Sequence, residues 1–185
     1  MRTLLLLLVP TIAIATEGSI GIWAGSSPAA PRLFNDGLWR GASAAVEATL
    51  KLPTSSVLFE VPLSITLGAE YIRPTATSTD LLDDYRGWIL RGSLVWYASG
   101  GTAPYLRLGG GASFGERYAR TVEWDTASPL QWQHRPSFAV FWGIGWRGMI
   151  AQHVEWAVEA ECLAGDEVGL LLPLRLGLFY RWGDR

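Results

Sequence analysis

The sequence predicts an all-β protein, an eight-stranded antiparallel up-and-down transmembrane β-barrel. Three observations carry this prediction: a leader typical of exported chains, eight segments whose residues alternate with period two, and connections that are alternately long and short. Of the 185 residues, 49% are hydrophobic and 17% are charged, with 21 Gly and 10 Trp. This composition excludes a disordered chain, and the lack of a Gly-X-Y period excludes collagen.

The first 15 residues have the pattern of an export signal. Arg2 supplies a positive region, Leu4 to Val9 an apolar core, and Ala13-Ile14-Ala15 a small-residue cleavage site. A membrane anchor is the alternative, but the apolar run ends at Pro10 and is shorter than the ~20 residues of a transmembrane helix. We therefore expect a signal peptide over residues 1–15, cleavage after Ala15, and a barrel domain over residues 16–185.

In the mature chain, an apolar face alternates with a face of small or charged residues. The cleanest segment runs from Val57 to Ile72, where every odd position is apolar. The predicted strands cover about residues 19–24, 42–52, 57–72, 88–97, 106–115, 138–147, 154–162 and 170–182. Pro62 and Pro173 should mark bulges or strand ends. The alternation lapses at residues 170–172, and a bulge there would change which later residues face inward.

The connections fall into two classes by length. Residues 26–39, 74–84 and 119–136 are long and polar, whereas residues 53–56, 99–103 and 150–153 are turns of four or five residues. This alternation is typical of a membrane barrel whose long loops lie on one side and whose short turns lie on the other. Residues 165–167 form a shortened fourth outer loop in this interpretation.

Two architectures fit eight alternating strands. A soluble lipocalin-type barrel places the apolar face inside, and Gly21-Ile22-Trp23 matches the Gly-x-Trp of lipocalins; a membrane barrel turns this face toward lipid. An eight-stranded lumen is too narrow for the apolar set, and the longer segments, of about 11 to 16 residues, are long enough to cross a bilayer. We therefore expect the apolar face outside. Its tryptophans are Trp88, Trp96, Trp142, Trp146, Trp156 and Trp182.

With its export signal, eight alternating strands and an inner face rich in Arg and Glu, the chain resembles the small outer-membrane barrels of the OmpA and OmpX type. The resemblance covers the mature chain and rests on pattern. It implies a monomer in the bacterial outer membrane, in contact with the lipid bilayer and lipopolysaccharide. Such barrels usually end on an aromatic residue, whereas this chain continues past Trp182 with Gly183-Asp184-Arg185.

The inward face carries nearly equal numbers of basic and acidic residues, which predicts mutual pairing into a plug rather than an ion-selective lining. A solvated polar face is the alternative. We expect three carboxylates on one strand, Glu155, Glu159 and Glu161, to be neutralised by arginines of adjoining strands. The predicted network comprises Glu47, Lys51, Glu60, Glu70, Arg91, Arg107, Arg117, Arg147, Glu155, Glu159, Glu161, Arg175 and Arg181.

Aromatic residues gather at the ends of the segments, where the interfacial belts of a membrane barrel lie. The predicted belts comprise Trp39, Tyr71, Trp88, Trp96, Tyr105, Tyr118, Phe138, Tyr180 and Trp182.

We expect no catalytic, cofactor-binding or metal-binding residues. The only histidines are His134 and His153, and His134 lies on the opposite strand face from Ser137; Cys162 is the single cysteine. A net charge of −2 gives no reason to expect nucleic acid. The expected role is structural, or interaction and adhesion with an extracellular ligand through loops 26–39, 74–84 and 119–136. The alternatives are a lipid A-modifying acyl hydrolase or acyltransferase, a narrow small-solute pore, and a secreted lipocalin-like binding barrel.

Overall fold

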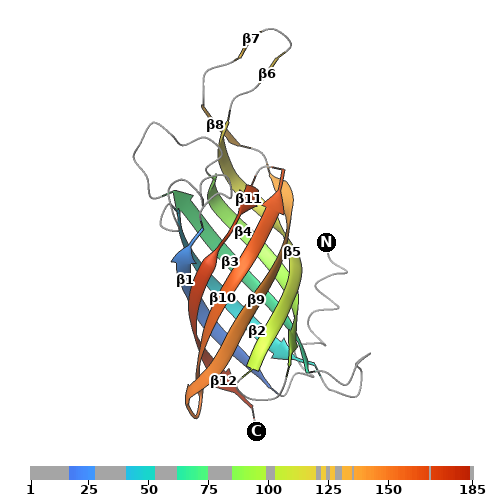
Figure 1. Cartoon of the computed structure of the whole chain (residues 1–185), viewed down its shortest axis with the longest axis vertical. Helices are drawn as coiled ribbons and strands as arrows, with labels where there is room; N and C mark the ends of the chain where they lie inside the picture. Colours follow the sequence, from blue (N-terminus) through green and yellow to red (C-terminus); the bar gives the residue numbers. More distant parts are fainter. Residues whose placement is uncertain are drawn as a thin grey trace, which may run out of the picture.

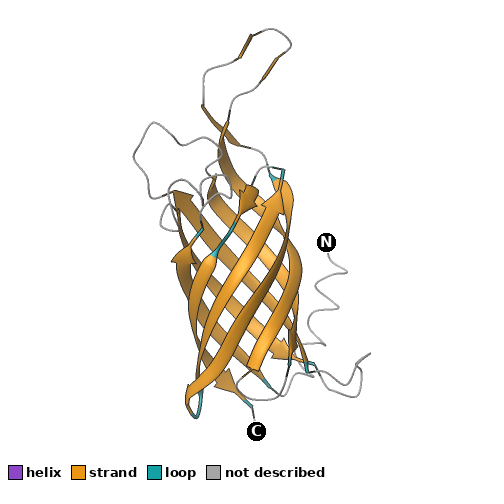
Figure 2. Cartoon of the chain, in the orientation of Figure 1, coloured by secondary structure: helices purple, strands orange, loops and turns teal. Residues whose placement is uncertain are grey.

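Eight long antiparallel strands close into a barrel in the computed structural model, which confirms the predicted fold class (Figures 1 and 2). Each strand pairs with the next along the barrel, and the last strand returns to pair with the first. The strands are β1 (Gly18–Ser26), β2 (Gly41–Lys51), β3 (Leu63–Pro74), β4 (Tyr85–Tyr97), β5 (Ala103–Ala119), β9 (Ser137–Ala151), β10 (Val154–Gly165) and β12 (Leu174–Trp182).

The structure describes residues 17–27, 41–52, 62–74, 85–98, 103–119, 122–123, 126–127, 131–134, 136–166 and 168–183. Within these ranges, no helix is long and apolar enough to cross a membrane. The leader and most of the loops 26–39 and 74–84 lie outside the described residues, as do the turn 53–56 and most of the turn 99–103.

The strands are strongly tilted, and one row of paired residues shows by how much. The row leaves β5 at Ser113 and returns to β5 at Ala103, ten residues earlier. It runs through Ser113, Ile89, Glu70, Ala45, Trp23, Gly177, Ala157, Arg147 and Ala103, all of which are buried. This stagger, together with eight strands, sets a lumen that side chains can fill.

Burial alternates along the strands, and the apolar set faces outward as predicted. Trp88, Leu108, Trp142 and Leu176 are between 51% and 66% exposed, although all lie within barrel strands. The residues between them are buried inside the barrel. An apolar surface this extensive is far larger than the patches on soluble monomers.

One end of the barrel carries an extension that the sequence analysis treated as a loop. β8 (Gln131–His134) pairs with the last residues of β5, and β6 (Val122–Glu123) pairs with β7 (Thr126–Ala127) beyond it (Figure 1). We call this the loop end. The opposite end, where β1 begins and β12 ends, is the terminal end.

Pro173 interrupts the last strand but does not shift it. The short β11 (Gly169–Leu171) and β12 both pair with β10. Leu171 lies opposite Leu163 and Leu174 lies opposite Ala160, so the register is the same on both sides of the proline. The proline has no N–H to donate, but its carbonyl accepts a 2.9 Å hydrogen bond from the backbone of β10.

The expected bulge at residues 170–172 is therefore absent from the described ladder, and Arg175 and Arg181 keep the side of the strand that the alternation predicts. The register shifts instead between Val154 and Glu155, beside the turn that joins β9 to β10. Pro62 immediately precedes β3, which confirms the prediction of a strand end.

Candidate functional site

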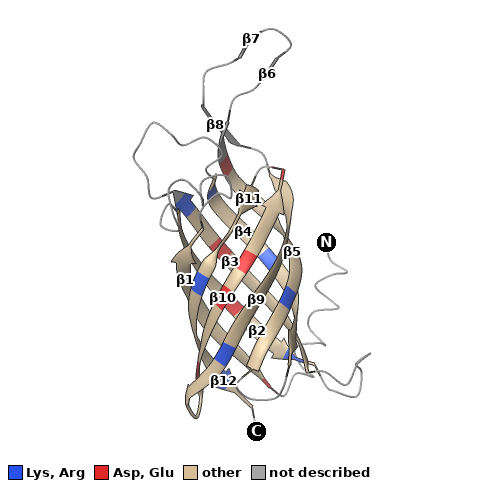
Figure 3. Ribbon diagram, viewed as in Figure 1, with Lys and Arg blue, Asp and Glu red and all other residues tan. Residues whose placement is uncertain are grey.

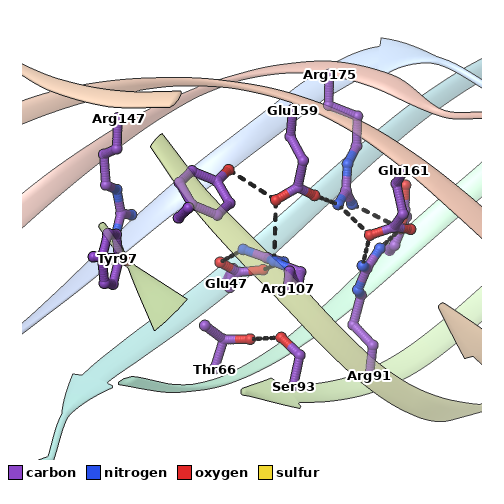
Figure 4. A network of polar contacts seen from close by, with 12 residues as sticks. Glu47, Thr66, Arg91, Ser93, Tyr97, Arg107, Arg147, Glu159, Glu161 and Arg175 are labelled. Carbon is purple, nitrogen blue, oxygen red and sulfur yellow. Dashed lines mark hydrogen bonds and ion pairs between the residues drawn. The ribbon is translucent and has the colours of Figure 1, made fainter. Parts of the chain in front are cut away.

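Seven charged side chains meet in the middle of the lumen (Figure 4). Figure 3 shows basic and acidic positions along the middle of the strands. The seven side chains come from six different strands and are each at most 5% exposed. We call them the central network: Glu47, Glu70, Arg91, Arg107, Glu159, Glu161 and Arg175. Every member occupies a buried position of the period-two alternation, so the strand geometry alone directs all seven inward.

Arg107 joins the carboxylates of β2 and β10. Its Nη1 and Nη2 donate to the two oxygens of Glu47 at 2.5 and 2.8 Å, and its Nε lies 3.1 Å from Oε2 of Glu159. The hydroxyl of Tyr105 donates to the same Glu159 oxygen at 2.8 Å. The fork-to-fork pair with Glu47 is the strongest geometry available to a guanidinium.

Arg175 bridges three carboxylates and is completely buried. Its Nη1 donates to Oε2 of Glu70 at 3.0 Å, its Nη2 donates to Oε2 of Glu161 at 2.8 Å, and it also pairs with Glu159. Arg91 pairs with Glu70 and Glu161 from the other side. Figure 4 shows Arg175 between Glu159 and Glu161. Such charges are tolerated away from water only while all partners are present.

The central network is not fully balanced. Four carboxylates face three guanidiniums, which leaves a formal charge of −1. One oxygen each of Glu70 and Glu161, Oε1 in both, is buried without a hydrogen-bond partner among the described residues. The two carboxylates that flank Arg91 are therefore each paired through a single oxygen, Oε2.

Aromatic rings lie between the guanidiniums and the glycine-rich barrel wall. The guanidinium of Arg91 is 3.9 Å from the centre of the Phe141 ring, and that of Arg147 is 4.0 Å from the centre of the Phe179 ring. A Cβ atom added to Gly109 would overlap the Phe141 ring. Inward glycines thus make room for rings, and the rings offer cation–π contacts to the arginines.

Two further rings follow the same arrangement. Trp23 lies 5.1 Å from Arg175 and 5.7 Å from Arg107, and its ring meets Phe179 edge-on at 5.1 Å. Tyr105 covers Gly145 so closely that a Cβ there would enter the ring. Small residues were predicted for the lumen, but the aromatic rings that fill the space beside them were not.

A second group of charges lies toward the terminal end. Arg147 and Arg181 lie 3.3 and 3.5 Å from the two oxygens of Glu155, and Arg181 is also 3.3 Å from Glu17. Lys51 donates to Glu17 at 2.5 Å. This hydrogen bond, together with the positive charges of Lys51 and Arg181, holds the pKa of Glu17 below its usual value.

The loop end of the lumen is filled by apolar side chains instead. Eight residues form this loop-end apolar cluster, each at most 2% exposed: Ile72, Tyr85, Ile89, Ala139, Phe141, Leu163, Val168 and Leu171. The sequence predicts an inward face of small and charged residues, so this cluster was not predicted. The parity that its strand residues share with inward arginines and glutamates was the signal that could have revealed the cluster.

The predicted network residues fall into three groups. The structure brings the central network together and places Glu155, Arg147 and Arg181 near the terminal end. Lys51 lies at the rim with its side chain 45% exposed, so its prediction as an interior residue is wrong. Glu60 lies outside the described residues, and for Arg117 only the backbone in β5 is described.

Several of the residues predicted for the aromatic belts face outward. Tyr71 and Trp88 face outward on neighbouring strands with ring centres 5.1 Å apart, and Phe138 and Tyr180 are also exposed. Trp96 and Trp182 are half-buried, while Trp39 and the Tyr118 side chain lie outside the described parts.

The belt assignment of Tyr105 is wrong. Tyr105 is 4% exposed and hydrogen-bonded inside the lumen. Its position at the start of a strand suggested an interface, but it has the same parity as Arg107, which turns it inward.

The described residues contain no group of three His, Cys, Asp or Glu that could hold a metal ion. His153 is exposed in the turn between β9 and β10, with its ring 5.9 Å from that of Tyr180. Cys162 is a free thiol on the outward side of β10.

No protein-family model matches the chain, and no curated protein is similar to it in sequence. Solved structures match it along nearly its whole length. Neisserial surface protein A matches with a TM-score of 0.56 and 10% identity, over 91% of this chain and 96% of that one. Ail, the attachment invasion locus protein of Yersinia pestis, matches with a TM-score of 0.55 and 16% identity, over 91% of this chain and 100% of that one.

The N-terminal β-barrel domain of Pseudomonas aeruginosa OprF matches with a TM-score of 0.52 and 11% identity, over 89% of this chain and 97% of that one. At such low identities, the likeness is one of fold. The structural neighbours are small eight-stranded outer-membrane β-barrels, and this chain has their closed eight-stranded fold.

Proposed function

We propose that this chain is a monomeric β-barrel of the bacterial outer membrane with a closed lumen, acting structurally or through its loop end. The outward face carries the proposal. Its large apolar residues, between 36% and 67% exposed, lie along all eight barrel strands. A water-soluble lipocalin-like barrel needs the reverse arrangement, with polar residues outside and an apolar pocket inside.

The two ends support an orientation. Tyr71, Trp88 and Phe138 lie outward toward the loop end, and Tyr180 lies outward toward the terminal end, as aromatic belts at two interfaces require. Outer-membrane barrels have short turns on the periplasmic side and longer loops outside. The loop end, with its β5–β8 extension, therefore faces the cell exterior, and the terminal end faces the periplasm.

The lumen contents favour a plug over a pore. The loop-end apolar cluster lies nearest the exterior, and the central network lies below it with Arg175, Glu70 and Glu159 completely buried. A conducting channel would need hydrated charges along a continuous path. Buried, mutually paired ions and packed rings instead make the barrel a rigid support for its loops.

The support then presents an interaction surface outside the cell. The strand ends that flank loops 26–39 and 74–84 lie at the loop end, beside the β5–β8 extension. These two loops and loop 119–136 are the proposed contacts with an extracellular ligand. One structural neighbour is named an attachment invasion locus protein, which is consistent with a role in adhesion.

Heat-modifiable migration tests the class of protein. The folded chain in mild detergent should run faster on a gel than the boiled chain, and it should partition into lipid vesicles. A chain that stays in the aqueous phase and migrates identically with and without boiling contradicts the membrane barrel.

Two measurements separate the proposed role from its alternatives. Single-channel recording across a planar bilayer should show no discrete conductance steps, and stable steps would favour the small-solute pore. Incubation with lipopolysaccharide should release no acyl chains and transfer none, and either reaction would favour a lipid A-modifying enzyme.

A further inference from the structure

The outward face of the barrel carries charge at one place. Within the described parts of the eight barrel strands, three charged side chains face outward: Arg73 on β3, Arg86 on β4 and Glu116 on β5. All three lie at the loop end of adjacent strands, and Figure 3 shows basic positions at the upper ends of β3 and β4. The remaining outward positions of these strands are apolar or small.

The two arginines lie next to each other. Ile72 pairs with Gly87, so Arg73 and Arg86 are the next positions on the two strands. Like charges directly opposite each other in a sheet destabilise it. Glu116 lies opposite Arg86 in the ladder and compensates its charge. Nη2 of Arg86 is 2.6 Å from Oε2 of Glu116. Arg73 is exposed, and the described residues provide it with no ion-pair partner.

An aromatic pair marks the depth of these arginines. Tyr71 precedes Arg73 by two residues and Trp88 follows Arg86 by two, and their rings are 5.1 Å apart. Two residues of a strand span roughly 7 Å, which is about the thickness of one headgroup layer. Arg73 and Arg86 therefore lie about one headgroup layer above the two rings. Below the rings, the outward positions continue with Leu90 and Leu67 into the apolar band.

We propose that Arg73 and Arg86 form a binding site for the phosphorylated headgroup of an outer-leaflet lipid, the phosphorylated sugars of lipopolysaccharide. The site rests on the proposed function, because the loop end must face the outer leaflet. Guanidinium forks bind phosphate oxygens in pairs. A phosphate between the two arginines removes their repulsion, and the acyl chains then lie against Tyr71, Trp88 and the apolar band.

The test uses the full folded barrel in a neutral detergent, with purified lipopolysaccharide as the probe. Lipid retained after size-exclusion chromatography is quantified across a titration. Relative to the wild type, Arg73→Gln should weaken retention by about tenfold and the double variant with Arg86→Gln by more, since a hydrogen bond between charged groups is worth about 1.5–3 kcal/mol, or a factor of ten or more. The matched control Lys51→Gln removes one exposed cation at the terminal end and should change retention less than about twofold.

Two further probes distinguish the source of the phosphate. Lipopolysaccharide stripped of its phosphates should be retained no better by the wild type than by the double variant. Inorganic phosphate should not displace the intact lipid, and displacement at low concentration would identify a free-phosphate site and overturn the proposal. Equal retention of intact lipopolysaccharide by the wild type and the double variant overturns it as well.

The outcome separates this site from the proposed function. If the barrel shows heat-modifiable migration but the arginine variants retain lipid normally, only the headgroup site fails. If the wild-type chain does not fold into detergent, the membrane barrel itself fails.

Discussion

The two halves of the lumen are filled by opposite chemistries. Toward the loop end, Ile72, Ile89 and Leu163 pack in an apolar cluster, whereas the middle is occupied by ion pairs around Arg107 and Arg175. Apolar side chains can relax around a missing group, and the loss scales with its size. A buried charge has no such tolerance, because removal of its partner leaves it uncompensated. The same strand alternation therefore produces one part of the lumen that tolerates the loss of a side-chain group and another part that is stable only while every charged partner is present.

Arg175→Met should have the largest effect on stability, and it is the strongest test of the difference between the two parts of the lumen. Arg175 faces three carboxylates and is completely buried, so its loss leaves Glu159 and Glu161 with fewer partners. We expect a loss of about 3–5 kcal/mol in the free energy of unfolding. The midpoint of urea unfolding in micelles measures it, and adding Arg107→Met should further lower the temperature of the heat-modifiable gel shift.

The exposed Arg86 supplies the matched control for this substitution. Arg86→Met removes a half-exposed ion pair and should cost less than about 1 kcal/mol. Equal effects of the two arginine variants would show that burial of the central network contributes nothing to stability.

Gly145→Ala should have a smaller effect than Arg175→Met, with a cost of about 1–3 kcal/mol. A Cβ at this position would enter the Tyr105 ring and approach the carbonyl of Val158 at 2.7 Å. Since Tyr105 donates to Glu159, the strain reaches the central network. Gly92→Ala is the control, because its nearest contact would be an ordinary 3.4 Å to Leu67. The same unfolding midpoints for both variants would show that the ring does not need the glycine.

Glu161→Gln should cost less than Glu47→Gln, which sharpens the distinction between a carboxylate that is paired through both oxygens and one that is paired through Oε2 alone. Glu47 makes both bonds of a fork with Arg107, and its loss should cost about 1.5–3 kcal/mol. Glu161 has one buried oxygen without a partner among the described residues, and the network has one carboxylate in excess. We therefore expect Glu161→Gln to cost under about 1 kcal/mol. The midpoints of urea unfolding measure the loss of stability in both variants. A larger loss for Glu161→Gln than for Glu47→Gln would contradict the inference that the network has one carboxylate in excess.

The direction of each strand residue could be predicted from the sequence, but its partners could not. Period two sets which side Arg107 or Glu159 takes, whatever the rest of the chain does. Whether they meet depends on the ten-residue stagger around the barrel, which is a property of all eight strands together. Local pattern contains no information about that stagger.

The errors in the predicted site have the same origin. Tyr105 was assigned to a belt because it lies near a strand end, although its parity with Arg107 places it inside. Lys51 follows the inward parity, but β2 ends at this residue, so its amine lies at the rim. Glu17 was missed because it precedes the first strand. Parity is reliable within a strand, whereas position along the barrel axis is set by strand ends and tilt.

The smallest expected effect concerns Glu17, whose ion pairs are exposed rather than buried. Its pKa is lower in the folded chain than the usual 4.5, because Lys51 donates to it and Arg181 lies near. Its contribution to stability is therefore complete above the usual pKa and is lost as the pH falls through the lowered one. At neutral pH, Glu17→Gln should cost less than about 1 kcal/mol, and at a pH well below the lowered pKa of Glu17 it should cost nothing.

Urea unfolding of both chains between neutral and acid pH measures this difference. Lys51→Gln is the companion variant, since in its background the substitution of Glu17 should have a smaller effect at neutral pH. A cost of Glu17→Gln that stays constant down to acid pH would mean that backbone effects, not the ion pair, produce it. The contrast with Arg175→Met then has one physical cause, because both residues pair with opposite charges and only Arg175 does so away from water.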